Sequence, residues 1–396
     1  MKHFREKFPF FHKKQKFTFL DSASTTQKPM AMIKTLQQFY SNEYANVHRG
    51  GYDLSIDATL KFEETRDSIA KFINAASSKE IIFTKNATES INLIATSFAF
   101  QILKENDEVL ISAMEHHANI IPWQQICLQR NAKLKIIPVN KDGNIKITKM
   151  RNLLSQATKI IAITYMSNVF GSIVDVISVI NVAKKYGIKT IIDACQAIAH
   201  VNIDVQKLDC DFLVFSAHKL YGPTGVGILY GKQALLDVML PYQVGGAMNQ
   251  HVAFHKSEFL TTPLKFEAGT PMIAEVIAFK TVLDFLKQNN WQKKWDHEYE
   301  ILCFIKEELK KMTDFIILGD KQKSIISFLH KTAHSSDIGE ILNQQNIAIR
   351  VGYHCAQPLM HHLSIEGTAR VSLGVYNSFM DAKKFITALK EINKVL

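Results

Sequence analysis

Cysteine is scarce in this sequence, and it does not occur in the spacings that structural sites use. The five cysteines are odd in number, and no two of them form a C-x-x-C pair. Both facts argue against a disulfide framework and against a structural zinc site. We therefore expect no metal site, and the unpaired thiols favour a reducing compartment such as the cytoplasm.

Long apolar runs are also absent. No stretch approaches the roughly 20 apolar residues that cross a bilayer, and charges interrupt every apolar run of the basic segment 1–17, which lacks the apolar centre of a signal peptide. Glycine and proline are few, with 17 and 9 among 396 residues, and 47% of the residues are hydrophobic. We expect a cytoplasmic globular protein without a membrane partner, long enough for two domains.

Acidic residues are outnumbered by basic ones, 37 against 47, which gives a formal net charge of +10. The basic residues are mostly lysines spread along the chain, with no arginine stripe, zinc-finger spacing or RNP-like aromatic block. A solvated lysine-rich surface explains this pattern more simply than a nucleic-acid face, so we expect no nucleic-acid partner. The non-enzymatic alternative is a protein that binds nucleic acid or another anion, with salt-sensitive binding and no bound cofactor.

Short apolar, β-branched runs recur along the first two thirds of the chain, with helical patterns between several of them. They are EIIFT (80–84), DEVLISA (107–113), KLKIIPV (133–139), TKIIAITYM (158–166), IKTIIDA (188–194), CDFLVFS (210–216) and GVGILYG (225–231). Strands that are apolar throughout are typical of a mostly parallel sheet covered on both faces. These runs predict an α/β domain over residues 21–285.

The pattern changes after the segment EAGTP (267–271). Helical segments are expected at 272–288 and at about 290–312, followed by the strand-like runs IISFLH and IAIRVG and a final amphipathic helix. We predict a smaller α+β domain formed by residues 1–20 and 286–396. The sequence contains no internal repeat and no low-complexity linker.

Polar residues gather where the predicted strands end. They are Thr88, His117, Asn168, Asp193, Gln196, Ser216, His218 and Lys219. In an open parallel sheet, ligands bind beyond the carboxyl ends of the strands. No G-x-x-x-x-G-K-[ST] motif is present, but a helix that starts at Ala87–Thr88 offers free N–H groups and a hydroxyl to a phosphate. An ordinary helix start remains the alternative for that segment.

Lys219 and Asp193 carry the main chemical argument. Lys219 stands at the end of an apolar strand, before a Gly-Pro turn, and Asp193 ends the preceding strand. A lysine able to form a Schiff base and an aspartate facing a protonated ring nitrogen are the two essentials of a pyridoxal-phosphate site. The pair predicts a pyridoxal 5′-phosphate enzyme.

Longer motifs resemble a known family. The segment IIDACQAIAHVNIDVQKLDCDFLVFSAHKLYGPTGVGILYG resembles the core of the class-V aminotransferases, which have PLP-dependent transferase fold type I. LDSASTTQKP, NVHRGGYDLS, MEHHANIIPWQ, FEAGTP and VGYHCAQPLM are similar to the group II cysteine desulfurases of the SufS and CsdA type. The resemblance implies an α/β fold in which a large domain with a mostly parallel central sheet is joined to a smaller α+β C-terminal domain.

The resemblance also implies residue roles. Lys219 would carry the cofactor, Asp193 would pair with its ring nitrogen, and His117 would stack on its face and move a proton at sulfur. The remaining cofactor contacts that it implies are Ala87, Thr88, Asn168, Gln196, Ser216, His218 and, from the other subunit of a homodimer, Thr270. For the substrate it implies a carboxylate clamp at Arg370, with Arg350, Asn168, His48 and Arg49 lining the cleft.

Cys355 decides the expected reaction. It follows His354 in a loop bounded by glycine and proline, and it matches the sulfur-accepting cysteine of the family. The resemblance implies conversion of L-cysteine to L-alanine, with a persulfide on Cys355 that passes to an acceptor protein of the SufE, SufU or CsdE kind. A selenocysteine lyase that takes L-selenocysteine at the same site is the alternative. Two departures from the family pattern are Ser24, where alanine is usual, and Ala247, where glutamate is usual.

Overall fold

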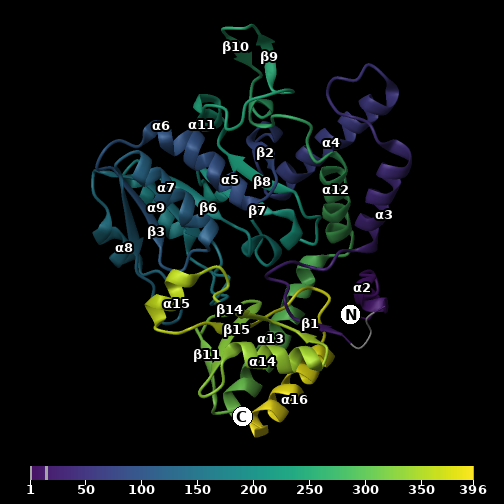
Figure 1. Cartoon of the computed structure of the whole chain (residues 1–396), viewed down its shortest axis with the longest axis vertical. Helices are drawn as coiled ribbons and strands as arrows, with labels where there is room; N and C mark the ends of the chain where they lie inside the picture. Colours follow the sequence, from purple (N-terminus) through teal and green to yellow (C-terminus); the bar gives the residue numbers. More distant parts are fainter. Residues whose placement is uncertain (1, 14–16, 396) are drawn as a thin grey trace.

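A seven-stranded sheet forms the centre of the molecule (Figure 1). The computed structural model describes residues 2–13 and 17–395. The strands, in spatial order, are β2 (Ile81–Thr84), β8 (Gly227–Gly231), β7 (Phe212–Ser216), β6 (Lys189–Asp193), β5 (Thr158–Thr164), β3 (Glu108–Ser112) and β4 (Lys133–Ile137). β8 is antiparallel to both of its neighbours, and the other neighbouring pairs are parallel. All seven predicted strands and the mostly parallel sheet are confirmed.

Helices cover both faces of this sheet. Alternate strand residues point to opposite faces, so Leu110 belongs to one core cluster while Val109 and Ile111 belong to the other. The first cluster takes in α4 (Asp53–Phe72), α8 (Ile147–Leu153), α9 (Val176–Lys185) and α12 (Ile273–Gln288), and the second takes in α5 (Ala87–Ile94) and α7 (Ile121–Gln129). Burial on two faces explains why the inner strands are largely apolar rather than alternating, whereas the edge strand β4 carries two lysines and is partly exposed.

A second, smaller sheet is antiparallel and follows the order β11 (Phe315–Leu318), β12 (Ile325–His330), β15 (Thr368–Ser372) and β14 (Arg350–Gly352). Its core takes in α13 (Trp295–Lys311), α14 (Ser335–Gln344) and α16 (Phe379–Val395). The single strand predicted for IAIRVG is wrong. Its first residues form β13 (Ile347–Ala348), which pairs with β1 (Thr18–Phe19), and only the later ones join the four-stranded sheet as β14.

The N-terminal segment touches both parts of the chain. Phe8 follows α1 (Lys2–Arg5) and packs against Tyr221, Phe285 and Tyr376. The predicted division into 21–285 against 1–20 with 286–396 stays a prediction, and residues 1, 14–16 and 396 of it lie outside the described residues.

The remaining elements lie around these two sheets. They are α2 (Phe10–Lys13), α3 (Met30–Gln38), α6 (Phe100–Ile102), α10 (Val205–Leu208), α11 (Gln233–Val238), α15 (Gln357–Leu363), β9 (Asn249–Val252) and β10 (Ser257–Phe259). The hairpin β9–β10 projects from one end of the molecule (Figure 1). Within the described residues, none of the helices combines the length and the apolar character needed to cross a membrane.

Candidate active site

A cavity of about 270 Å³ lies at the carboxyl ends of the central strands. The sequence-predicted residues that line it are Ala87, Thr88, Asn168, Asp193, Gln196, Ser216, His218, Lys219, Arg350 and Arg370. The first eight lie at or just after the ends of strands in the large sheet, Ala87 and Thr88 in the first turn of α5, and the two arginines come from β14 and β15 of the smaller sheet. The fold therefore brings most of the predicted residues together at one place between the two sheets.

Lys219 ends a short 3-10 turn that follows β7 directly. The carbonyl oxygen of the preceding residue, His218, accepts hydrogen bonds from the Thr26 N–H at 3.1 Å, the Thr26 hydroxyl at 2.9 Å and Lys28 Nζ at 3.1 Å. Burial lowers the pKa of Lys28 to about 7. Donors from the 25–28 segment thus fix the backbone from which the Lys219 side chain projects.

Asp193 stands at the end of β6 and is 5% exposed. Its Oδ1 accepts a hydrogen bond from the Cys195 N–H at 2.9 Å, and Gln196 Nε2 donates to the Ala23 carbonyl at 2.9 Å. Burial, and then the neighbouring Asp193 charge, raises the pKa of the Cys195 thiol, which keeps that thiol protonated. Cys195 and Asp193 therefore both line the cavity, and burial disfavours the thiolate of Cys195.

The start of α5 closes one end of the cavity. Asn86 caps the helix by accepting from the Glu89 N–H at 2.9 Å, and the Ala87 N–H donates to Ser216 Oγ at 2.9 Å. A side chain at Gly227 would collide with Asn86, since an added Cβ would lie 2.4 Å from its carbonyl carbon. This glycine allows β8 to approach the helix start, and the arrangement leaves Thr88 facing the cavity.

The position predicted for His117 is occupied by its neighbour. His116 lines the cavity, whereas His117 does not. The N–H of His117 donates to the Cys355 carbonyl at 2.7 Å, and its Nε2 accepts from the Gln357 N–H at 3.0 Å. Burial, and then the nearby Lys219 charge, lowers the pKa of His116 to about 4. The placement of His117 in the cavity was therefore wrong, because the 3-10 turn His117–Asn119 directs the second histidine away.

Glu115 was missed by the sequence analysis. It is fully buried, where it accepts hydrogen bonds from the Ser112 hydroxyl and from Asn119 Nδ2. Burial raises its pKa to about 8, and the neighbouring Asp193 acts in the same direction. The signal available in the sequence was a glutamate directly before the histidine pair in MEHHAN. Its contacts fix the backbone that presents His116.

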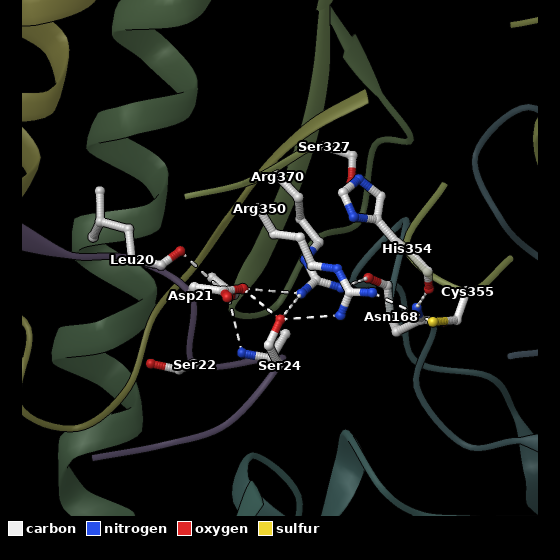
Figure 2. A network of polar contacts seen from close by, with 12 residues as sticks. Leu20, Asp21, Ser22, Ser24, Asn168, Ser327, Arg350, His354, Cys355 and Arg370 are labelled. Atoms are coloured by element: carbon white, nitrogen blue, oxygen red, sulfur yellow. Dashed lines mark hydrogen bonds and ion pairs between the residues drawn. The ribbon is translucent and has the colours of Figure 1, made fainter. Parts of the chain in front are cut away.

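Two arginines and a serine join the cavity to the thiol (Figure 2). Arg370 is 1% exposed and donates from Nη1 to the Asn168 carbonyl at 3.0 Å and from Nη2 to Asp21 Oδ1 at 3.2 Å. Burial lowers its pKa to about 10, against the opposing effect of Asp21. Arg350 Nη2 donates to Cys355 Sγ at 3.3 Å. Cys355 itself does not line the cavity, and Arg350 is the residue that connects them.

The loop that carries Cys355 has an unusual backbone. His354 and Cys355 have φ angles of 52° and 54°, in the left-handed region. His354 is buried and its Nε2 contacts the Thr368 hydroxyl at 2.7 Å, while its carbonyl accepts from Asn168 Nδ2 at 2.7 Å. Cys355 is half-buried. The buried histidine anchors the loop, so the thiol is held beside Arg350.

Comparison with known families decides the identity of this site. The family described as Aminotransferase class-V matches residues 18–385. This chain belongs to the class-V aminotransferase family. Enzymes of this family use pyridoxal 5′-phosphate, so this class-V protein is a PLP-dependent enzyme.

Named relatives of this class-V protein are cysteine desulfurases. A probable cysteine desulfurase from Vibrio cholerae is 42% identical, over 94% of this chain and 92% of the relative. A cysteine desulfurase from Synechococcus elongatus is 39% identical over 94% of this chain, and the aligned part spans only 60% of that longer relative. Among solved structures, the cysteine desulfurase CsdA from Escherichia coli is 35% identical, with a TM-score of 0.94, covering 100% of this chain and 98% of that one.

The residues that line the cavity fit pyridoxal phosphate, the cofactor of the family. An amine for the aldehyde and a buried carboxylate for the ring nitrogen are present in Lys219 and Asp193. The start of α5, with the Ser216 hydroxyl and Thr88 beside it, offers donors to a phosphate. The cavity therefore contains a group of the right chemistry for each end of pyridoxal phosphate.

Three of the predicted site residues lie away from the main cavity. Thr270, His48 and Arg49 line a separate cavity of about 170 Å³ and do not line the main one. Arg49 Nη2 donates to the Ala247 carbonyl at 3.3 Å. The role of Thr270 in the site of a second subunit stays a prediction. Among the residues that the structure describes, no group of three or more His, Cys, Asp and Glu could hold a metal ion.

The two histidines make a testable pair in this class-V protein. We expect His116→Ala to lower kcat about 100-fold, because a neutral imidazole in the cavity can exchange protons with a reacting group. We expect His117→Ala to lower kcat less than about tenfold, since that side chain only accepts a backbone hydrogen bond beside the Cys355 loop. Steady-state rates of alanine formation from L-cysteine measure both. The opposite ranking would return the assignment to His117.

Proposed function

We propose that this protein is a cysteine desulfurase that converts L-cysteine to L-alanine and holds the released sulfur as a persulfide on Cys355. The observation that carries the proposal is the contact between Arg350 and Cys355 Sγ, which places a thiol beside the cavity that contains Lys219 and Asp193. An aminotransferase needs no such thiol. The relatives named as cysteine desulfurases support the same reaction.

The residues of the cavity divide the work on the substrate. When bound, pyridoxal phosphate supplies an electron sink that stabilises a carbanion next to the substrate amine. The buried Asp193 carboxylate keeps a positive charge on a facing ring nitrogen. The Lys219 amine removes the proton from the substrate Cα, and Arg370 binds the substrate carboxylate. His116, which is neutral near pH 7, is placed to accept or return a proton at the substrate sulfur.

The transfer of sulfur to Cys355 needs no added oxidant. The Cys355 thiolate attacks the substrate sulfur, so an S–S bond forms and the substrate Cβ–S bond breaks. The electron pair of the broken bond stays on the substrate carbon skeleton, and a proton completes the methyl group of alanine. The net change is L-cysteine plus the Cys355 thiol to L-alanine plus the Cys355 persulfide.

The proposed persulfide implies an acceptor for the sulfur and a reducing compartment. The sulfur passes from Cys355 to an acceptor protein of the SufE, SufU or CsdE kind, for iron–sulfur cluster assembly or a related sulfur supply. We place the protein in the cytoplasm, where thiols stay reduced. A homodimer would bring Thr270 of one subunit to the site of the other, which accounts for its position outside the main cavity.

The test of this proposal is alanine release by the purified protein. We expect a yellow protein that forms L-alanine from L-cysteine in the presence of dithiothreitol, which releases the bound sulfur as sulfide. Rates on L-cysteine and L-selenocysteine are compared side by side. Alanine from L-selenocysteine alone would contradict the proposal and favour a selenocysteine lyase, and a colourless protein with salt-sensitive nucleic-acid binding would contradict both.

A further inference from the structure

Ser24 lies at the centre of the polar network that joins the cavity to the thiol (Figure 2). Its side chain lines the cavity. Its Oγ donates to Asp21 Oδ1 at 2.7 Å, accepts from Arg370 Nη2 at 3.0 Å and accepts from Arg350 Nη1 at 3.2 Å. A serine hydroxyl has one donor and two acceptor sites. All three are therefore used, two of them by guanidinium groups.

The two arginines that share this hydroxyl face different parts of the reaction. The Nε donor of Arg370 is buried and has no hydrogen-bond partner among the described residues. A buried guanidinium N–H without a partner is costly, and a carboxylate in the cavity would satisfy it. Arg350 faces the thiol, with Nη2 on Cys355 Sγ. The Ser24 oxygen is the atom through which these two groups meet.

We propose that Ser24 is a positioning residue that couples carboxylate binding at Arg370 to the Cys355 thiol through Arg350. The inference rests on the proposed desulfurase function for the identity of the substrate. A carboxylate that binds Arg370 alters the hydrogen bond from Arg370 Nη2 to Ser24 Oγ. Because Arg350 Nη1 donates to the same oxygen, the contact between Ser24 and Arg350 changes as well. Because Arg350 Nη2 donates to Cys355 Sγ, a shift of Arg350 changes the setting of the thiol and how fast Cys355 reacts.

Alanine at position 24 would remove the shared contact, because a methyl group cannot accept from either arginine. In Ser24→Ala, Arg370 keeps Asp21 as a partner, whereas Arg350 Nη1 loses its contact with Ser24. The expected loss is therefore one of alignment between the two arginines, with the rest of the site intact.

Three variants of the holoenzyme test the role of the hydroxyl. Ser24→Ala removes it and Ser24→Thr retains it. Ser22→Ala is the matched control. Ser22 lies on the same segment as Ser24, but its Oγ contacts the Tyr376 hydroxyl, at 2.8 Å, and neither arginine. We expect Ser24→Ala to raise KM for L-cysteine about tenfold with kcat within about threefold, since hydrogen bonds to charged groups are lost. Ser24→Thr and Ser22→Ala keep KM near the wild-type value.

The decisive readout does not depend on turnover. Cys355 is alkylated by iodoacetamide with and without saturating L-alanine, which carries the carboxylate but no sulfur, and the Cys355 peptide is followed by mass spectrometry. We expect L-alanine to change the alkylation rate at least about threefold in the wild type, Ser24→Thr and Ser22→Ala, and less than about 1.5-fold in Ser24→Ala, if one hydrogen-bonded bridge carries the coupling.

Each outcome bears on the proposal. An equal response to L-alanine in Ser24→Ala and the wild type would overturn the coupling, as would no response in the wild type. A wild type that responds to L-alanine but forms none from L-cysteine would refute the desulfurase function and still support the coupling. Loss of the response in Ser22→Ala would show a general effect of the segment and would also overturn the role of Ser24.

Discussion

Lys219→Ala protein forms no measurable alanine from L-cysteine, a loss of at least about 10⁴-fold in kcat. The reason is that the same amine would hold the cofactor and move the Cα proton, and Lys219 stands at the end of the 3-10 turn that follows β7. Alanine supplies neither function. Steady-state assays of alanine formation measure the loss, and borohydride reduction followed by peptide mapping shows which lysine carries the cofactor.

Lys28 provides the control for the assignment of the cofactor to Lys219. It is the other lysine close to the turn, its pKa is lowered to about 7 by burial, and its Nζ contacts the His218 carbonyl. We expect the cofactor mass on the Lys219 peptide in the wild type and in Lys28→Met, whose activity falls less than about tenfold because other donors still hold that carbonyl. Cofactor on the Lys28 peptide, or turnover above about 1% in Lys219→Ala, would contradict the assignment.

Much of the fold was predictable because burial on two faces leaves a direct trace in a sequence. β7 is buried along its length and β5 is buried from residue 160 on, and both contain an unbroken apolar run, at residues 212–215 and 160–163. The same rule failed for IAIRVG, because its apolar run crosses from a two-stranded sheet to a four-stranded one. Only tertiary pairing separates β13 from β14, and no local residue preference marks the change of partner.

The site was predictable where its residues stand at strand ends. Asp193 and Lys219 share a cavity because neighbouring strands of a parallel sheet end at the same edge. The choice between His116 and His117 was not predictable, because the two are adjacent and identical in chemistry. A short 3-10 turn decides which ring enters the cavity. The role of Ser24 was hidden for another reason, since its partner Arg370 lies on the smaller sheet, far away in the sequence.

Cys355→Ala is the second variant with a large expected effect. Alanine formation from L-cysteine should fall at least about 10³-fold, because no thiolate remains beside Arg350 to take the substrate sulfur. The visible absorption of the bound cofactor should stay unchanged, since Cys355 does not line the cavity. Alanine formation and absorption are measured on the same samples. Selenocysteine, whose carbon–selenium bond is weaker, remains the substrate on which this variant can still act.

The other cysteines supply the control. Cys303 is half-buried on α13 and unpaired, like Cys355, but it lies on a helix far from the cavity. We expect Cys303→Ala to keep wild-type rates, and trypsin fragments of cysteine-treated wild type to carry the added sulfur on Cys355 alone. Cys195 is half-buried and lines the cavity, but its raised thiol pKa disfavours the thiolate, so we expect no added sulfur on Cys195. Wild-type turnover in Cys355→Ala would refute the persulfide on Cys355. The contact between Arg350 and Cys355 Sγ would then have only a structural role in the loop.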